Sequence, residues 1–160
     1  MRKRILAALL AACLLLGLTG CATSAKKGTP KDFTFDKLTI TMNSAFTQSN
    51  AAENGVYYRS SDVAAVIIKD TFDKLDGITT IQDYVNRVFE ANDLDATLDE
   101  SGEIPFFTYN NTVNKIDFFY YAAVFKGSDA FWLVQFGCDQ QDQDTFLPMF
   151  EEFAASVRVE

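Results

Sequence analysis

The chain has 160 residues, of which 14 are basic and 22 acidic, and it contains no histidine. Its net charge of −8 argues against binding to nucleic acid, because phosphates attract basic surfaces. The absence of histidine excludes Ser-His-Asp and Cys-His catalysis and the HExxH zinc site.

The first twenty residues have the pattern of a signal peptide. Arg2, Lys3 and Arg4 precede residues 5–18, a segment without a charge. As a helix this segment would be roughly 21 Å long, too short for the ~30 Å hydrocarbon core of a bilayer. A buried helix of a globular domain would have a polar face, which the segment lacks. We therefore expect residues 1–20 to be removed.

Cys21 is the predicted point of attachment to a membrane. Leu18-Thr19-Gly20-Cys21 resembles the lipobox of bacterial lipoproteins. The resemblance implies cleavage before Cys21 and attachment of a diacylglyceryl group, with acyl chains such as palmitate, to its thiol. Each buried methylene contributes about 0.8 kcal/mol, so two or three chains make a stable anchor. The protein is then expected on the extracytoplasmic face of the cell membrane.

The remaining cysteines support this interpretation. Cys13 is lost with the leader and Cys21 is acylated, so Cys138 is the one thiol of the mature chain. No disulfide can then form within the chain. Cys138 is either a small buried side chain, which is the commoner use of a lone cysteine, or it forms a disulfide bridge to another molecule.

Removal of the leader leaves a short tether and one domain. The mature chain has 140 residues with 11 basic and 22 acidic groups, a net charge of −11. Residues 21–32, CATSAKKGTPKD, predict a flexible tether, because they are polar, contain Gly and Pro, and lack an apolar period. Residues 33–160 have the length of a single domain.

The first part of this domain predicts strands. Residues 33–42 alternate in polarity, which predicts one strand with Leu38, Ile40 and Met42 on its buried face. Asn54-Gly55 is typical of a turn. Residues 56–59 and 63–69 predict a hairpin of two strands.

A helix is predicted at residues 79–92. Thr79 and Gln82 have the spacing of a capping box, and apolar residues follow at helical spacing. A strand over residues 103–109 and a turn over residues 110–114 come next.

Two long strands and a second helix complete the domain. Residues 115–125 and 130–138 predict two strands joined by a short loop. Residues 118–125 and most of residues 131–134 are apolar on both faces, which predicts a central hairpin with cover above and below. The helix is expected to begin near Asp144 or Thr145, which would place Pro148 in its first turn. Its apolar stripe consists of Phe146, Met149, Phe150, Phe153, Ala154 and Val157. The sequence therefore predicts an α+β fold, an antiparallel sheet with helices on both faces.

This order of elements resembles the Mog/PsbP-like α-β-α sandwich, in particular small lipoproteins of Gram-positive bacteria with that fold. The best matching segments are residues 38–42, 120–125 and 129–136, and the resemblance covers residues 33–160. The family has no shared catalytic motif. Because PsbP-like domains are accessory subunits and the Mog branch binds a protein partner, the resemblance implies binding rather than catalysis.

Carboxylates offer the remaining candidates for chemistry. Asp139, Asp142 and Asp144 are weak candidates for calcium, because their spacing is not that of an EF-hand; the alternative is a solvated helix start. No nucleotide-binding motif occurs, and nothing selects a catalytic pair among the 22 acidic residues. We therefore expect no enzyme activity and no cofactor.

Aromatic residues suggest either a binding platform or a core. The strands contain Tyr57, Tyr58, Tyr120, Tyr121 and Trp132, and core packing is the commoner role of such residues. From the whole sequence we expect a membrane-anchored, non-enzymatic lipoprotein with an envelope protein as partner. The alternative is a lipoprotein that binds a small ligand or an ion.

Replacing Cys21 with Ala tests the anchor. We expect the variant to remain unprocessed or to be released from the membrane, because the acyl chains have no thiol to join. Fractionation of expressing cells and the mass of the product measure both effects. A processed Cys21→Ala protein that stays on the membrane would contradict the prediction.

Overall fold

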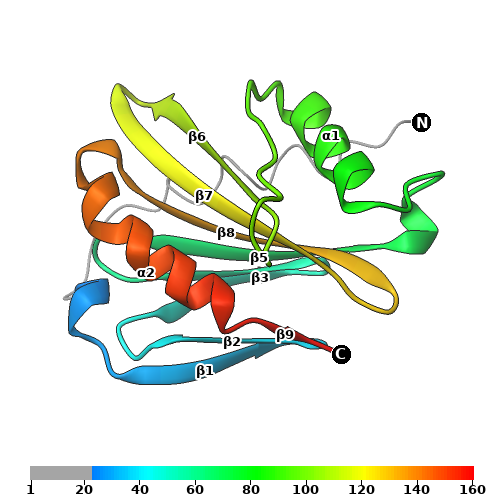
Figure 1. The fold of residues 1–160 in the computed structure, drawn as a ribbon. Helices are drawn as coiled ribbons and strands as arrows, with labels where there is room; N and C mark the ends of the chain where they lie inside the picture. Colours follow the sequence, from blue (N-terminus) through cyan, green and yellow to red (C-terminus); the bar gives the residue numbers. More distant parts are fainter. Residues whose placement is uncertain (1–22) are drawn as a thin grey trace.

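Two antiparallel sheets and two helices make up the part of the chain that the structure, a computed structural model, describes: residues 23–160 (Figure 1). The predicted signal peptide and Cys21 lie outside these residues. The larger sheet has the order β3-β4-β5-β8-β7-β6, and the smaller one has the order β1-β2-β9.

The elements have the following bounds. The larger sheet contains β3 (Thr47–Ala52), β4 (Gly55–Arg59), β5 (Ala64–Thr71), β6 (Phe106–Val113), β7 (Ile116–Lys126) and β8 (Ala130–Asp139). The smaller sheet contains β1 (Pro30–Phe35), β2 (Leu38–Asn43) and β9 (Arg158–Val159). The helices are α1 (Ile81–Asn92) and α2 (Gln143–Ala155), and short 3-10 helices occupy Ala25–Lys27, Phe72–Lys74 and Gln140–Asp142.

The larger sheet is buried on both faces at its centre, as the sequence predicts. Strand β8 lies between β5 and β7, and its side chains are buried from Ala130 to Cys138. Because successive side chains of a strand point to opposite faces, such a strand must be covered twice.

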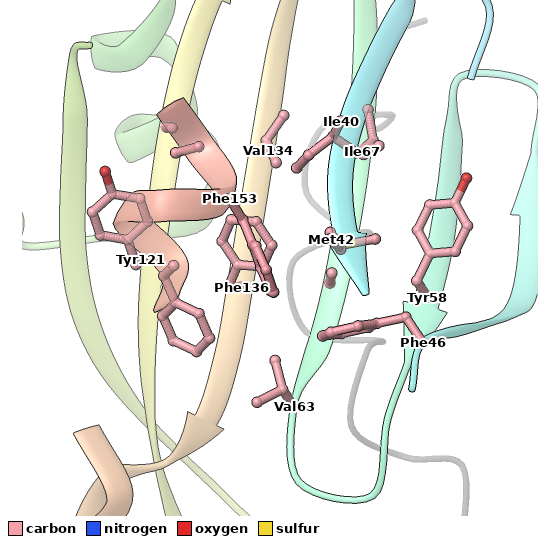
Figure 2. Close-up of a cluster of buried hydrophobic side chains, with 14 of the residues drawn as sticks. Ile40, Met42, Phe46, Tyr58, Val63, Ile67, Tyr121, Val134, Phe136 and Phe153 are labelled. Atoms are coloured by element: carbon pink, nitrogen blue, oxygen red, sulfur yellow. The ribbon is translucent and has the colours of Figure 1, made fainter. Parts of the chain in front are cut away.

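Each face has its own hydrophobic cluster. On one face, Val66 and Ile68 of β5 belong to the same cluster as Tyr84, Val85 and Val88 of α1. The alternate residues Ala65 and Ile67 belong to the second cluster, with side chains of β2, β8 and α2. Figure 2 shows this second cluster, in which Ile40, Met42, Val134, Phe136 and Phe153 converge.

The α+β class is therefore correct, with one addition on the second face. There α2 is accompanied by the small sheet, which the sequence did not predict. The Ser156 hydroxyl at the end of α2 joins the two, because it accepts from the Thr41 N–H at 2.9 Å and lies 3.1 Å from the Thr41 carbonyl oxygen. Leu38, Ile40 and Met42 face this cluster, as predicted.

Residues 33–42 are two strands rather than the single one predicted. The chain turns at Asp36 and Lys37, and Phe33 pairs with Ile40 across the hairpin. Asp36 has a φ of 51°, a conformation that Asp tolerates better than most residues. The alternation of polar and apolar side chains continues on both sides of this turn, so the pattern did not reveal it.

Two other strand boundaries differ from the prediction. Strand β3 was missed because all six of its residues are exposed, so it has no apolar alternation. Strand β6 continues to Val113, and the turn falls at Asn114 and Lys115, with φ values of 52° and 70°. Two consecutive positive values are typical of a tight hairpin turn.

Both helices begin one residue or more away from the predicted start. Thr80, not Thr79, caps α1, since its Oγ1 accepts from the Asp83 N–H at 3.1 Å. Helix α2 begins at Gln143, so Pro148 lies in the second turn rather than the first. A proline there removes one hydrogen bond of the helix.

Residues 24–32 belong to the domain and are not a free tether. Ala25 is fully buried in the second cluster, and its N–H donates to Asp62 Oδ1 at 2.9 Å. Ser24 Oγ lies 2.5 Å from Asp62 Oδ2, and the Asn43 side chain donates to the Ala25 carbonyl at 2.6 Å. These contacts come from distant residues, which is why local composition predicted a tether.

Replacing Phe150 with Ala tests the second cluster. Phe150 is fully buried and stacks on Phe136 with 5.1 Å between ring centroids. We expect the free energy of unfolding to fall by about 3–5 kcal/mol in urea titrations, because a large cavity opens. Glu151→Ala, on the exposed side of the same helix, is the matched control. A loss below about 1 kcal/mol for Phe150→Ala would contradict this packing.

Candidate functional site

A groove of about 740 Å³ lies between α1, the β3–β4 turn and the end of β5. The chain builds it by reversing direction after β5. The 3-10 helix Phe72–Lys74 and the buried Leu75 turn the chain, and α1 then returns over the same face of the sheet. The Lys69 N–H donates to the Asn54 carbonyl at 2.7 Å, which fixes the β3–β4 turn beside the end of β5.

The lining of the groove is charged, with acidic groups in excess. The cations are Lys74 and Arg87, and the carboxylates are Glu53, Asp70, Asp76, Asp83 and Glu90. Lys69 also lines the groove, but its Nζ lies on the other face of the sheet, 5.3 Å from the centroid of the Trp132 ring. Apolar atoms come from Leu75, Ile78 and Ala91.

Asp70 is the carboxylate that the fold buries. It follows Val66 and Ile68 on the α1 side of β5, and only 7% of its surface is exposed. The hydroxyl of Tyr84, on α1, donates to Asp70 Oδ2 at 2.7 Å, and the Asn54 side chain also donates to this carboxylate. Tyr84 is itself fully buried and stacks on Phe131 with 4.8 Å between centroids.

The electrostatics of this pair follow from burial. Loss of solvent raises the pKa of Asp70, and the hydrogen bond from Tyr84, the charge of Lys74 and the hydrogen bond from Asn54 offset only part of that effect. Burial and the neighbouring Asp70 raise the pKa of Tyr84 well above its usual value. Tyr84 therefore keeps its proton and remains a hydrogen-bond donor.

The cations of the groove are engaged with other carboxylates. Lys69 Nζ lies 2.6 Å from Asp36 and 3.1 Å from Asp129. Lys74 Nζ lies 3.6 Å from Glu53, and Arg87 lies 3.6 Å from Glu90. Within residues 23–160, no lysine or arginine forms an ion pair with Asp70.

The acidic candidates at the start of α2 do not form a metal centre. Asp139, Asp142 and Asp144 lie where β8 passes into α2. Over the described residues, no three His, Cys, Asp or Glu side chains come together in a way that could hold a metal ion.

The aromatic candidates belong to the interior. Each has at most 8% of its surface exposed: Tyr57, Tyr58, Tyr120, Tyr121 and Trp132. The interpretation of these residues as core is confirmed.

Cys138 is a buried side chain, the commoner of its two predicted uses. It is unpaired and only 2% exposed. Burial, together with nearby Asp142, Asp139 and Asp62, raises the pKa of its thiol to about 12. The reactive thiolate is therefore scarce at neutral pH.

Sequence reasoning missed Asp70 and its partner Tyr84. The signal was present, because Val66, Ile68 and Asp70 continue one face of a strand whose prediction ended at Lys69. A polar residue on the face that a helix covers requires a hydrogen-bonding partner.

Comparison with known proteins identifies the fold. The chain has a TM-score of 0.58 at 9% identity to the Ran-binding protein Mog1p of Saccharomyces cerevisiae, over 82% of this chain and 96% of that one. The score is 0.52 at 12% identity to the cyanobacterial PsbP (CyanoP) of Synechocystis, over 91% and 99%. The domain has a Mog1/PsbP-like fold.

A longer protein has the same fold. A crystal structure from Bacteroides thetaiotaomicron gives a TM-score of 0.56 at 12% identity, and it aligns with 78% of this chain but only 45% of its own length. The sequence matches no protein-family model and no curated protein. No helix within residues 23–160 is long and apolar enough to cross a membrane.

Replacing Asp70 with Asn tests the buried carboxylate. A raised pKa in the folded protein means that wild-type stability falls as pH rises from the unfolded pKa, about 3.9, through the folded pKa. The Asp70→Asn variant does not lose stability in this way, because the amide does not ionise. We therefore expect the stability of Asp70→Asn relative to wild type to be greater at pH 7 than at pH 4.

Urea unfolding at the two pH values measures this difference. Asp73→Asn, which removes an exposed carboxylate outside the groove, is the control for the changed charge. A relative stability of Asp70→Asn that is equal at both pH values, or lower at pH 7, would contradict the assigned direction of the pKa shift.

Proposed function

We propose that this protein is a lipid-anchored accessory protein of the bacterial cell envelope. In this proposal it catalyses no reaction and binds another envelope protein. The observation that carries the proposal is the fold, which it shares over most of its length with a Ran-binding protein and with cyanobacterial PsbP. A likeness at 9–12% identity establishes the fold, and the extension to protein binding is the proposal.

The proposed location rests on the sequence at Cys21. The cationic start, the uncharged run and Leu18-Thr19-Gly20-Cys21 together favour an acylated protein on the extracytoplasmic face of the membrane, as in Gram-positive lipoproteins. The lack of histidine and the buried Cys138 thiol favour binding over catalysis.

Binding of a small ligand is a second candidate, and the groove favours it. Ligand sites are concave and place a few polar groups around an apolar wall. The groove is concave and combines polar groups such as Asp70 and Asn54 with apolar atoms of Ile78 and Leu75, within a lining that is mostly charged.

Crosslinking in intact cells that express the lipidated protein tests the proposal. We expect mass spectrometry to find one dominant envelope protein, captured by the wild type and lost with Cys21→Ala, because the anchor holds the two proteins in one compartment. An expressed lipoprotein with an unrelated domain is the matched control. Capture of the same proteins by that control would contradict the proposal and favour the small-ligand alternative.

A further inference from the structure

Asp70 is a buried carboxylate with polar donors but no counter-ion among the described residues. Tyr84 and Asn54 donate neutral hydrogen bonds to it, while the lysines and arginine of the groove pair with other carboxylates. A buried carboxylate is stabilised most by a cation that approaches within hydrogen-bond distance. The groove therefore has a place for one positive charge that the described chain does not fill.

We propose that the groove binds a lysine side chain of the partner protein, whose ammonium group pairs with Asp70. This inference rests on the proposed function and names the chemistry of the contact. The excess of carboxylates around the groove attracts a basic segment, and Asp70 lies in its wall beside Asn54.

The hydrogen bonds of Asp70 favour lysine over arginine. Arginine binds a carboxylate best through two parallel N–H bonds that occupy both oxygens. Here Oδ2 already accepts from Tyr84 at 2.7 Å, and Asn54 supplies a further donor. A compact ammonium needs only one remaining acceptor position, so it fits this carboxylate better.

The wall of the groove suits the rest of a lysine side chain. Leu75, Ile78 and Ala91 provide apolar atoms against which four methylene groups can pack. At about 740 Å³ the groove has room for the side chain and part of its backbone.

Lys74 is the resident competitor for Asp70. Its charge acts on Asp70, yet its Nζ pairs with Glu53, and 56% of the Lys74 side chain is exposed. If an incoming ammonium occupies the place next to Asp70, removal of the Lys74 charge should make binding tighter.

NMR titration of the full-length protein, extracted from membranes in a nonionic detergent, tests the inference. The probe is the peptide Ac-Gly-Lys-Gly-NH₂, and the matched peptide with norleucine has the same stem without the charge. A third peptide has arginine in place of the lysine. We expect the lysine peptide to shift the signals of Asn54 and Tyr84. We expect the norleucine peptide and the arginine peptide to bind less tightly than the lysine peptide. If the norleucine peptide bound as tightly as the lysine peptide, the inference would be overturned. Tighter binding of free putrescine, a small diamine, than of the lysine peptide would also overturn it, because the groove would then be a site for a small ligand.

Three variants assign the effect to Asp70. We expect Asp70→Asn to weaken binding of the lysine peptide at least about tenfold, Lys74→Gln to tighten it, and the control Asp73→Asn to leave it unchanged. The amide spectrum of each variant reports whether it is folded. A folded Asp70→Asn protein with wild-type affinity would overturn the inference.

Crosslinking in cells separates this inference from the proposed function. Loss of the captured protein in Asp70→Asn, with retention in Asp73→Asn, supports both. Retention of that protein in both variants overturns the lysine contact and leaves the accessory role standing. Failure of the wild type to capture a specific protein counts against the accessory role itself.

Discussion

The architecture depends on the burial of both faces of the central strands. β5, β8 and much of β7 carry apolar side chains on each side, so neither face can be left to solvent. One face is covered by α1, and the other by α2 together with the small sheet. The short β9 strand, which pairs with β2 after α2 ends, closes that second layer. A different segment of the chain covers each face, and each cover ends at the termini of its own helices or strands. Polar residues meet at these ends of the covered faces.

The groove is one of these edges, and it explains the unusual position of Asp70. Tyr84 lies near the beginning of α1, and its hydroxyl donates a hydrogen bond to Asp70 near the end of β5. A carboxylate there serves as the acceptor for a phenol that would otherwise be buried without a partner. Burial leaves the negative charge of Asp70 poorly solvated, and the hydrogen bond from Tyr84 offsets only part of that loss. The proposed lysine contact would supply the charge that is missing there.

The sequence predicted the elements whose own residues determine their burial. The two-faced apolar strands, the stripe from Phe146 to Val157 and the alternation of Leu38, Ile40 and Met42 each have a period that can be read locally. Strand β3 and the buried Ala25 have no such period, because their positions depend on β4 and on Asp62.

The candidate site was harder to predict for the same reason. Asp139, Asp142 and Asp144 are close in sequence, which made them visible, but they do not assemble into a metal centre. The groove joins the β3–β4 turn, the end of β5 and α1, which are far apart in the chain. Only the tertiary fold brings Asn54, Asp70 and Tyr84 together.

The burial of Ala25 affects how far the groove would lie from the membrane. If Cys21 carries the proposed anchor, three residue steps connect it to Ser24, a span of at most roughly 11 Å. Ser24 is tied to Asp62, just before β5 begins, whereas Asp70 lies near the other end of that strand. With about 3.3 Å per residue, the eight residues of β5 separate the two ends by roughly 25 Å. With that anchor, the end of the domain at Ser24 would be held close to the membrane, and a partner would have to reach the opposite end of β5 to enter the groove.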